Sequence, residues 1–213
     1  MPTAAIKICG ISTQDALEAA IRARADHAGF VFFPKSPRNV TPAEAALLAA
    51  RAEGHIGRVG LFVDADDATI AEAMASARLD AFQLHGSESP ERAAHLRSRY
   101  GVAVWKALSV ATAEDAAKAA AYAGAVDLVL FDAKTPKGTL PGGMGLSFDW
   151  NLVANWKGPV AWGLAGGLNP ENVAEAVRLT GTPLVDTSSG VESAPGVKDL
   201  DRIDAFVRAV RSS

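Results

Sequence analysis

Short apolar segments and longer amphipathic segments alternate along the 213 residues of the chain. The short segments are rich in Val, Ile and Phe, whereas the longer ones carry Ala, Glu and Arg at helical spacing. The short segments predict eight β-strands, at residues 4–9, 27–33, 57–63, 80–85, 102–107, 126–132, 159–166 and 183–188. The longer segments predict seven helices, at residues 13–25, 41–53, 67–78, 89–100, 112–123, 169–180 and 199–211. A weaker helical segment, 148–156, follows the sixth strand.

Three of the predicted helices begin with a capping signature. Thr41, Ser89 and Asn169 each precede a proline, and each proline is followed within two residues by a glutamate. A short polar side chain caps the first turn of a helix, and proline suits the first helical position. We therefore expect helices to begin directly after these three residues.

Strict alternation of strands and helices predicts a parallel sheet covered by helices. Eight such units with no additional strand and no break in composition predict an α/β fold, a single (β/α)8 TIM barrel that spans residues 1–213 as one domain. The structural alternative is a doubly wound open sheet, which usually has fewer strands and a glycine-rich turn after the first. The long Gly- and Pro-containing stretch 133–147 is predicted to be an active-site lid rather than a domain boundary.

Composition and charge narrow the classes of function. The chain is 49% hydrophobic and 21% charged, with a net charge of -3, which is ordinary for a globular protein. Lys and Arg form no stripe, so we expect no nucleic acid and no membrane surface among its partners. The first ten residues lack the pattern of a signal peptide, and no apolar run approaches the ~20 residues that cross a bilayer.

Cys9 is the only cysteine in the chain. A single thiol can form neither an internal disulfide nor a cysteine-based zinc cluster. We therefore expect it to stay reduced, which favours a cytoplasmic protein. His85 is the one histidine predicted at a strand end, with no second histidine at ligand spacing, so we expect no metal.

Reactive side chains gather where the predicted strands end, which is where (β/α)8 enzymes carry their active sites. Cys9 ends the first strand, His85 the fourth and Asp132 the sixth. Arg38 lies in the loop after the second strand, where its guanidinium could bind a carboxylate through two parallel hydrogen bonds. The alternative for Arg38 is a solvated loop side chain.

Side chains on a strand alternate between its two faces. Ile6 and Ile8 suit the helix-covered face, so Lys7 is predicted to point into the barrel. The same parity predicts inward positions for Cys9, Gln83, His85, Asp132 and Asp186. A buried lysine needs a partner, and the first and eighth strands of a closed barrel are neighbours. We therefore predict that Lys7 pairs with Asp186.

Cys9 and Asp132 lie three strands apart around such a ring, so they are predicted to face each other across the barrel mouth. Two such groups on opposite sides of a substrate suit general acid–base catalysis of an isomerisation. A thiol acts as a base only where positive charge or dipoles lower its pKa, and Lys7 is the candidate source. The alternatives are a buried apolar role for Cys9 and a capping or ion-pairing role for Asp132.

Two turns have the composition of a phosphate site. Gly166 and Gly167 follow the seventh strand, and Ser188, Ser189 and Gly190 follow the eighth. In (β/α)8 enzymes these two strand ends frequently bind phosphate, because glycine backbones and serine hydroxyls offer close donors. Each turn by itself is also explained as a tight turn or a helix cap.

Seven segments, in chain order, resemble those of the phosphoribosylanthranilate isomerase family, a (β/α)8 barrel family of tryptophan biosynthesis. They read KICGI, GFVFFPKSPRNV, VGLFVD, QLHGSE, GGMGLSFDW, LAGGLNPENV and VDTSSGVESAPGVKD, and they run from residue 7 to residue 199.

The resemblance implies an Amadori rearrangement of N-(5-phosphoribosyl)anthranilate that needs no cofactor. In this scheme Asp132 protonates the ribose ring oxygen, and Cys9 removes the proton from C2. Arg38 matches the family's contact to the anthranilate carboxylate, and His85 matches a residue near the substrate. The two glycine-containing turns match the family's phosphate site.

Two other classes of function remain open at this stage. Another phosphate-binding barrel, such as a sugar-phosphate epimerase or an indole-glycerol-phosphate synthase relative, needs metal ligands or a Lys–Glu pair at the mouth. Lys106 ends the fifth strand, but no matching glutamate is evident. A non-catalytic phosphosugar-binding barrel would not need both Cys9 and Asp132. The sequence leaves open a monomer or a homodimer.

Overall fold

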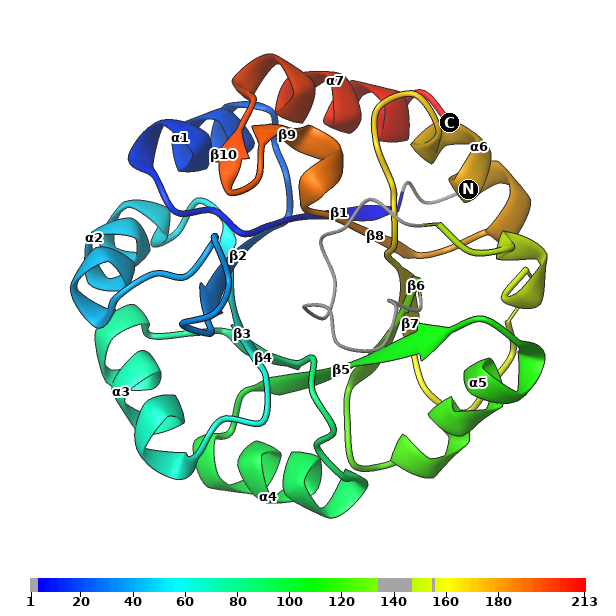
Figure 1. Ribbon diagram of the computed structural model, residues 1–213, viewed down its shortest axis with the longest axis horizontal. Helices are drawn as coiled ribbons and strands as arrows, with labels where there is room; N and C mark the ends of the chain where they lie inside the picture. The colour runs from blue at the N-terminus through cyan, green and yellow to red at the C-terminus, as the bar shows by residue number, and fades with distance from the viewer. Residues whose placement is uncertain (1–3, 134–146, 155) are drawn as a thin grey trace.

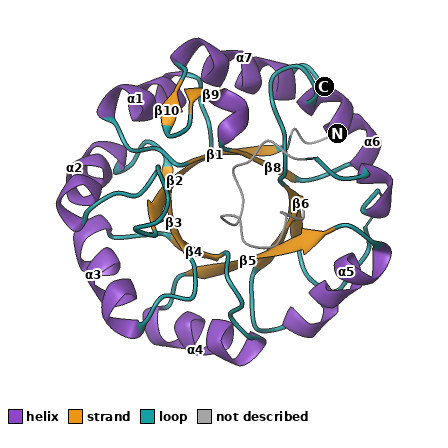
Figure 2. Ribbon diagram, in the orientation of Figure 1, coloured by secondary structure: helices purple, strands orange, loops and turns teal. Residues whose placement is uncertain are grey.

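Eight parallel strands close into a barrel in the order β1 to β8, each paired with its neighbours in the sequence and β8 with β1. The computed structural model describes residues 4–133, 147–154 and 156–213. Figure 1 looks down the barrel, with the helices arranged around it, and Figure 2 separates the inner ring of strands from the outer ring of helices. The (β/α)8 prediction is confirmed. The predicted lid, 133–147, lies outside the described residues except for its two end positions.

The barrel strands are β1 Ala5–Cys9, β2 His27–Phe32, β3 Gly57–Phe62, β4 Ala81–Leu84, β5 Ala103–Val110, β6 Leu128–Ala133, β7 Trp162–Leu164 and β8 Leu184–Thr187. The α-helices are α1 Gln14–Arg22, α2 Pro42–Ala52, α3 Asp67–Ala77, α4 Pro90–Tyr100, α5 Ala113–Ala117, α6 Val173–Thr180 and α7 Leu200–Arg211. Three short 3-10 helices are η1 Lys118–Tyr122, η2 Trp150–Leu152 and η3 Ser189–Val191. Within the described ranges, no helix is long and apolar enough to cross a membrane.

The two faces of the barrel strands bury two separate sets of side chains. Ile6, Ile8 and Phe131 belong to the large cluster between the strands and the helices. Trp105 and Leu130 belong to a smaller cluster that includes inward positions of several strands. Alternation along each strand produces this division, so the inside/outside assignment made from parity is confirmed.

Two of the three predicted helix caps are confirmed. The Thr41 hydroxyl accepts from the Glu44 backbone N–H, and the Glu44 carboxylate accepts in return from Thr41 N–H. Ser89 caps α4 in the same position. The third prediction is wrong, because α6 begins at Val173 and residues 170–172 form a turn. Asn169 caps that turn instead, since its side-chain oxygen accepts from the N–H groups of residues 171 and 172.

The expectation of no additional strand is also wrong. After β8 the chain forms a small antiparallel pair, β9 Glu192–Ala194 and β10 Val197–Lys198, outside the barrel. Segments of three and two residues are too short to show an alternating pattern, although the Pro195–Gly196 pair between them is a turn signal. The helical segments around strand β6 are shorter than predicted and partly 3-10, namely η1 and η2.

Candidate active site

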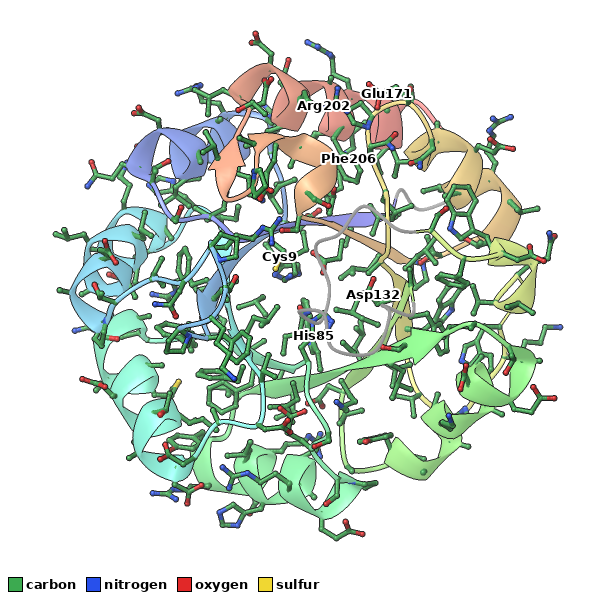
Figure 3. All side chains as sticks on the ribbon, in the orientation of Figure 1. Cys9, His85, Asp132, Glu171, Arg202 and Phe206 are labelled. Atoms are coloured by element: carbon green, nitrogen blue, oxygen red, sulfur yellow. The ribbon has the colours of Figure 1, made fainter. Side chains whose placement is uncertain are left out.

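Three of the predicted site residues meet at the carboxyl-terminal mouth of the barrel, where Figure 3 labels them. Cys9 is the last residue of β1, His85 directly follows β4, and Asp132 lies near the end of β6. Strands β7 and β8 separate β1 from β6 in the closed ring, so Cys9 and Asp132 approach from different arcs of the mouth. The strand order is the predicted one, and the action of these two side chains on opposite sides of a substrate stays a prediction.

Lys7 and Asp186 form the buried ion pair that parity predicted. They are register partners on β1 and β8, and the Lys7 Nζ lies 2.9 Å from Asp186 Oδ1. Their side chains are 0% and 8% exposed, so the pair is a buried polar contact inside the barrel. Burial works against the charge on Lys7, but Asp186 and Cys9 outweigh it, and the pKa of Lys7 is raised.

Cys9 sits in a buried and mostly apolar environment beside this pair. Its side chain packs with Val31 and Leu61, and the register position beside it on β2 is Gly29. A side chain at Gly29 would begin only 3.0 Å from the Cys9 Sγ, so the glycine keeps that flank of the thiol clear. Burial raises the pKa of the Cys9 thiol above its usual value, although Lys7 and Lys198 favour the thiolate. Lys7 therefore acts in the predicted direction, but burial outweighs it.

Asp132 is held by a contact that sequence reasoning missed. Its Oδ2 lies 3.1 Å from His85 Nε2, and its Oδ1 accepts from the N–H of Ala133 at 2.8 Å. The other ring nitrogen of His85, Nδ1, lies 3.3 Å from the side-chain nitrogen of Gln83. Parity placed all three side chains inside the barrel, but not in contact, because β4 and β6 are separated by β5 in the ring.

Arg38 is anchored by a carboxylate of the protein itself. Its Nε and Nη2 bond to the two oxygens of Glu192 at 2.8 and 2.7 Å. Glu192 also accepts from Lys198 Nζ at 2.7 Å, and Lys198 in turn donates to the backbone oxygen of Ser188 at 2.9 Å. Both residues belong to the β9–β10 pair, which the sequence did not reveal. The alternative of a solvated Arg38 is wrong, and its contact to a substrate carboxylate stays a prediction.

The two turns of the predicted phosphate site lie against each other. The Thr187 hydroxyl donates to the Leu168 carbonyl at 2.7 Å, and a side chain at Gly190 would begin 1.9 Å from the same oxygen. Gly166 has a φ of +82° and packs against the end of β6, where a side chain would meet Ala133 N at 2.4 Å. Both glycines are therefore required by close backbone approach. Gly167 and the Ser188–Ser189 pair complete these turns, so all five predicted residues share one rim of the mouth.

Arg202 connects the loop after β7 to the turn after β8 from the outer, helix-covered side. It lies on α7, and its Nη1 and Nη2 donate to both oxygens of Glu171 in the loop after β7, at 3.1 and 2.9 Å. Its Nε donates to the Gly190 carbonyl at 3.1 Å. Figure 3 shows Arg202 and Glu171 beside Phe206 at the outer side of this rim. Sequence reasoning missed this brace, because nothing in the spacing of Glu171 and Arg202 indicates their contact.

The statement that no glutamate matches Lys106 is wrong. Lys106 Nζ lies 3.0 Å from Glu88 Oε2 and also donates to the backbone oxygens of Leu84 and Gly86. Both side chains are at most 4% exposed. The pair fixes the turn that carries His85, which is a structural role. Among the described residues, no group of three or more His, Cys, Asp or Glu side chains is arranged to hold a metal ion.

Comparisons with known proteins agree with this geometry. The family model for N-(5'phosphoribosyl)anthranilate (PRA) isomerase matches residues 6–209. The N-(5'-phosphoribosyl)anthranilate isomerase of Paramagnetospirillum magneticum is 55% identical over 207 residues, which is 97% of this chain and 96% of the relative.

Two solved structures share the fold over nearly the whole chain. Monomers of the dimeric phosphoribosylanthranilate isomerase of Thermotoga maritima are 34% identical, with a TM-score of 0.85, over 99% of this chain and 100% of that one. A phosphoribosyl anthranilate isomerase in complex with reduced 1-(o-carboxyphenylamino)-1-deoxyribulose 5-phosphate is 33% identical, with a TM-score of 0.86 and the same coverage. The chain belongs to the N-(5'-phosphoribosyl)anthranilate isomerase family.

Proposed function

We propose that this chain converts N-(5-phosphoribosyl)anthranilate to 1-(2-carboxyphenylamino)-1-deoxyribulose 5-phosphate in tryptophan biosynthesis, by general acid–base catalysis. Membership of the isomerase family supports the reaction. The observation that carries the mechanism is the position of Cys9 and Asp132 on different arcs of one mouth, with an ionisable group at each end.

In the first step Asp132 gives a proton to the ribose ring oxygen. The electron pair of the C1–O bond moves to that oxygen, the ring opens, and the anthranilate nitrogen becomes part of a Schiff base. In the second step Cys9 takes the proton from C2. The freed electron pair forms a double bond between C1 and C2, and the π pair of the C1=N bond returns to the anthranilate nitrogen. The resulting enol-amine then relaxes to the ketone.

The environment of Cys9 limits how much of the base is available. Because burial raises the pKa of Cys9, the thiolate is a minor form at neutral pH. Lys7 and Lys198 favour the thiolate, so these two charges increase the reactive fraction against the effect of burial. The base therefore acts from a small thiolate population rather than from a fully ionised group.

The two ends of the substrate are assigned to different groups at the mouth. Gly166, Gly167 and the turn 188–190 are proposed to bind the phosphate, since their backbones approach closely and the serines add hydroxyl donors. Arg38 is proposed to bind the anthranilate carboxylate, as the resemblance to the family implies. His85 is proposed to lie near the substrate, because it contacts Asp132, the proposed acid.

We also propose that the reaction needs neither cofactor nor metal, because the acid and the base are both side chains of the chain. A small phosphosugar, and no nucleic acid, is the proposed partner, consistent with the net charge of -3.

The single reduced thiol supports a cytoplasmic location. We propose that residues 1–213 form one domain, which the single closed barrel supports. The assembly is proposed to be a monomer or a homodimer, as one relative is dimeric.

The test is a steady-state assay on the purified wild-type chain that follows the loss of substrate fluorescence. We expect turnover of N-(5-phosphoribosyl)anthranilate, unchanged by a chelator. Absence of turnover would refute the assigned reaction, and sensitivity to the chelator would refute the metal-free mechanism.

Arg38→Ala tests the binding of the carboxylate. Loss of a charged hydrogen-bonding partner should raise KM about tenfold or more, with a smaller effect on kcat. Arg22→Ala removes an exposed arginine from α1 and serves as the matched control. An unchanged KM in Arg38→Ala would remove this role.

A further inference from the structure

Gln83 is part of the acid half of the site although neither the sequence nor the proposed mechanism assigns it a role. It lies two residues before His85 on β4, so both side chains point into the barrel. Its side-chain nitrogen lies 3.3 Å from His85 Nδ1, and His85 Nε2 lies 3.1 Å from Asp132 Oδ2. The three side chains form one continuous line toward the mouth, where Figure 3 labels its last two members.

The side-chain oxygen of Gln83 is buried and, within the described part of the chain, has no hydrogen-bond partner. Gln83 is only 1% exposed, and its register neighbours on β3 and β5 are Leu61 and Trp105. Leu61 has no side-chain donor, and Trp105 does not donate to the Gln83 oxygen. A buried acceptor without a donor is unusual and needs an explanation.

The explanation follows from the symmetry of the amide group. Turning it by half a rotation exchanges its oxygen and nitrogen without moving the rest of the side chain. With nitrogen toward His85, Gln83 donates to Nδ1, and the single ring proton lies on Nε2 and faces the Asp132 carboxylate. With oxygen toward His85, Gln83 accepts from an Nδ1–H, and the His85–Asp132 pair then holds one proton more.

We propose that Gln83 is a positioning residue that stabilises the proton-loaded form of the His85–Asp132 pair. The inference rests on the proposed function, in which Asp132 gives a proton to the ring oxygen. In the loaded pair the amide oxygen of Gln83 bonds to Nδ1–H. After the proton has passed to the substrate oxygen, the pair holds one proton fewer, and the amide nitrogen bonds to the unprotonated Nδ1.

The other charged groups near the pair are Asp186, Cys9 and the Lys106–Glu88 pair, which fixes the turn that carries His85. Asp186 feels both Asp132 and His85 electrostatically and is itself held by Lys7. Cys9 belongs to β1, a different strand of the ring. Substitutions at Gln83 leave all of these groups in place, so a change in the protonation of His85 reports on the amide itself.

Two variants of Gln83 should change the protonation of the His85–Asp132 pair in opposite directions. In Gln83→Glu the carboxylate can only accept, so it should keep His85 protonated on both ring nitrogens. In Gln83→Met no group accepts from Nδ1, so the loaded form should be depleted. Gln14→Glu introduces the same change at an exposed position of α1 and is the matched control.

The readout is the nitrogen-15 NMR signal of the His85 ring, recorded for each variant over the same series of pH values. His27, at the opposite end of the barrel interior, is an internal reference for an intact fold. We expect the doubly protonated form to persist to higher pH in Gln83→Glu and to disappear at lower pH in Gln83→Met. We also expect kcat to fall about tenfold in Gln83→Met, with KM little changed.

The proposal is overturned if His85 has the same ring protonation at every pH in the wild type and in both variants while the His27 signal is unchanged. Failure of the proposed function gives a different result, because an inactive wild-type chain would still show the opposite shifts of His85.

Discussion

At the scale of single residues, the reactivity of the site depends on the competition between burial and charge around Cys9. The thiol is 4% exposed, and burial favours its neutral form, whereas Lys7 and Lys198 favour the thiolate. Burial prevails, so the pKa of Cys9 is raised. The two lysines still matter, because each of them limits how far the thiolate is disfavoured.

The thiolate can be titrated directly because the chain has one cysteine. A raised pKa means that the thiol form persists as pH rises past the ordinary cysteine value of about 8.5. We expect the ultraviolet absorbance of the thiolate, taken as wild type minus Cys9→Ala, to appear only above that pH. Lys7→Met should move it higher still. Full thiolate absorbance at neutral pH would contradict this account.

Individual contacts could be predicted from the sequence where strand alternation alone determines which side chains meet. Parity along β1 and β8 was enough to predict the Lys7–Asp186 pair, since register partners on neighbouring strands must meet. The same rule could not predict the His85–Asp132 contact, which joins side chains from non-adjacent strands across the mouth. Such contacts depend on side-chain length and rotamer, which a sequence pattern does not contain.

At the scale of elements, the loop after β2 and the β9–β10 pair are joined through Glu192. This carboxylate accepts from two atoms of Arg38, from Lys198 and, at 3.2 Å, from the N–H of Gly196. Its side chain is only 4% exposed. The cluster connects Arg38, the proposed carboxylate-binding residue, to Ser188 at the start of the proposed phosphate-binding turn. It therefore fixes these two parts of the proposed substrate site relative to each other.

Glu192→Gln tests this cluster and its dependence on pH. Burial works against the charge on Glu192, but Arg38 and Lys198 outweigh it and lower its pKa. A lowered pKa in the folded state stabilises the fold above the unfolded-state value of about 4.3, and this stability is lost as pH falls through the folded-state value. Removing one partner of a buried ion pair should cost roughly 3 kcal/mol in the free energy of unfolding at neutral pH.

Urea unfolding at a series of pH values measures this difference, which should shrink below about pH 4 as Glu192 becomes protonated. Glu171→Gln breaks a pair with Arg202 on the surface, whose side chains are 64% and 36% exposed, and should cost less than about 1 kcal/mol. Equal losses in the two variants, or a difference independent of pH, would be inconsistent with a buried charged Glu192.

The elements themselves were predictable to the extent that they are long and periodic. All eight barrel strands were predicted, and so were the helices between them, because each has an apolar face that shows in the sequence. The start of α6 and the β9–β10 pair were not predicted. There the chain is shaped by side-chain bonds of Asn169 and Glu192 rather than by periodic burial.

At the scale of the whole molecule, closure of the barrel makes every strand depend on its two neighbours. Strand β1 pairs with β2 on one side and with β8 on the other, so the two ends of the chain are joined in one sheet. Helix α7 also packs against α1, as Figure 1 shows. A ring of this kind has no free edge at which one half can separate from the other.

We therefore expect residues 1–213 to unfold as one unit. Urea titrations followed by far-ultraviolet circular dichroism and by tryptophan fluorescence should coincide. Trp105 reports on the barrel interior, and Trp162 on the layer between strands and helices. Two separate transitions would contradict the proposal of a single domain.

The central claim is that Cys9 and Asp132 act as the base and the acid of the isomerisation. The most direct measurement is kcat and KM for N-(5-phosphoribosyl)anthranilate in Cys9→Ala and Asp132→Asn, with Asp127→Asn, at the start of the same βα unit as Asp132, as the control. We predict a loss in kcat of about 10²- to 10⁴-fold in each of the first two variants, with KM changed little, and normal turnover in the control. Near-normal turnover in either Cys9→Ala or Asp132→Asn would contradict the account.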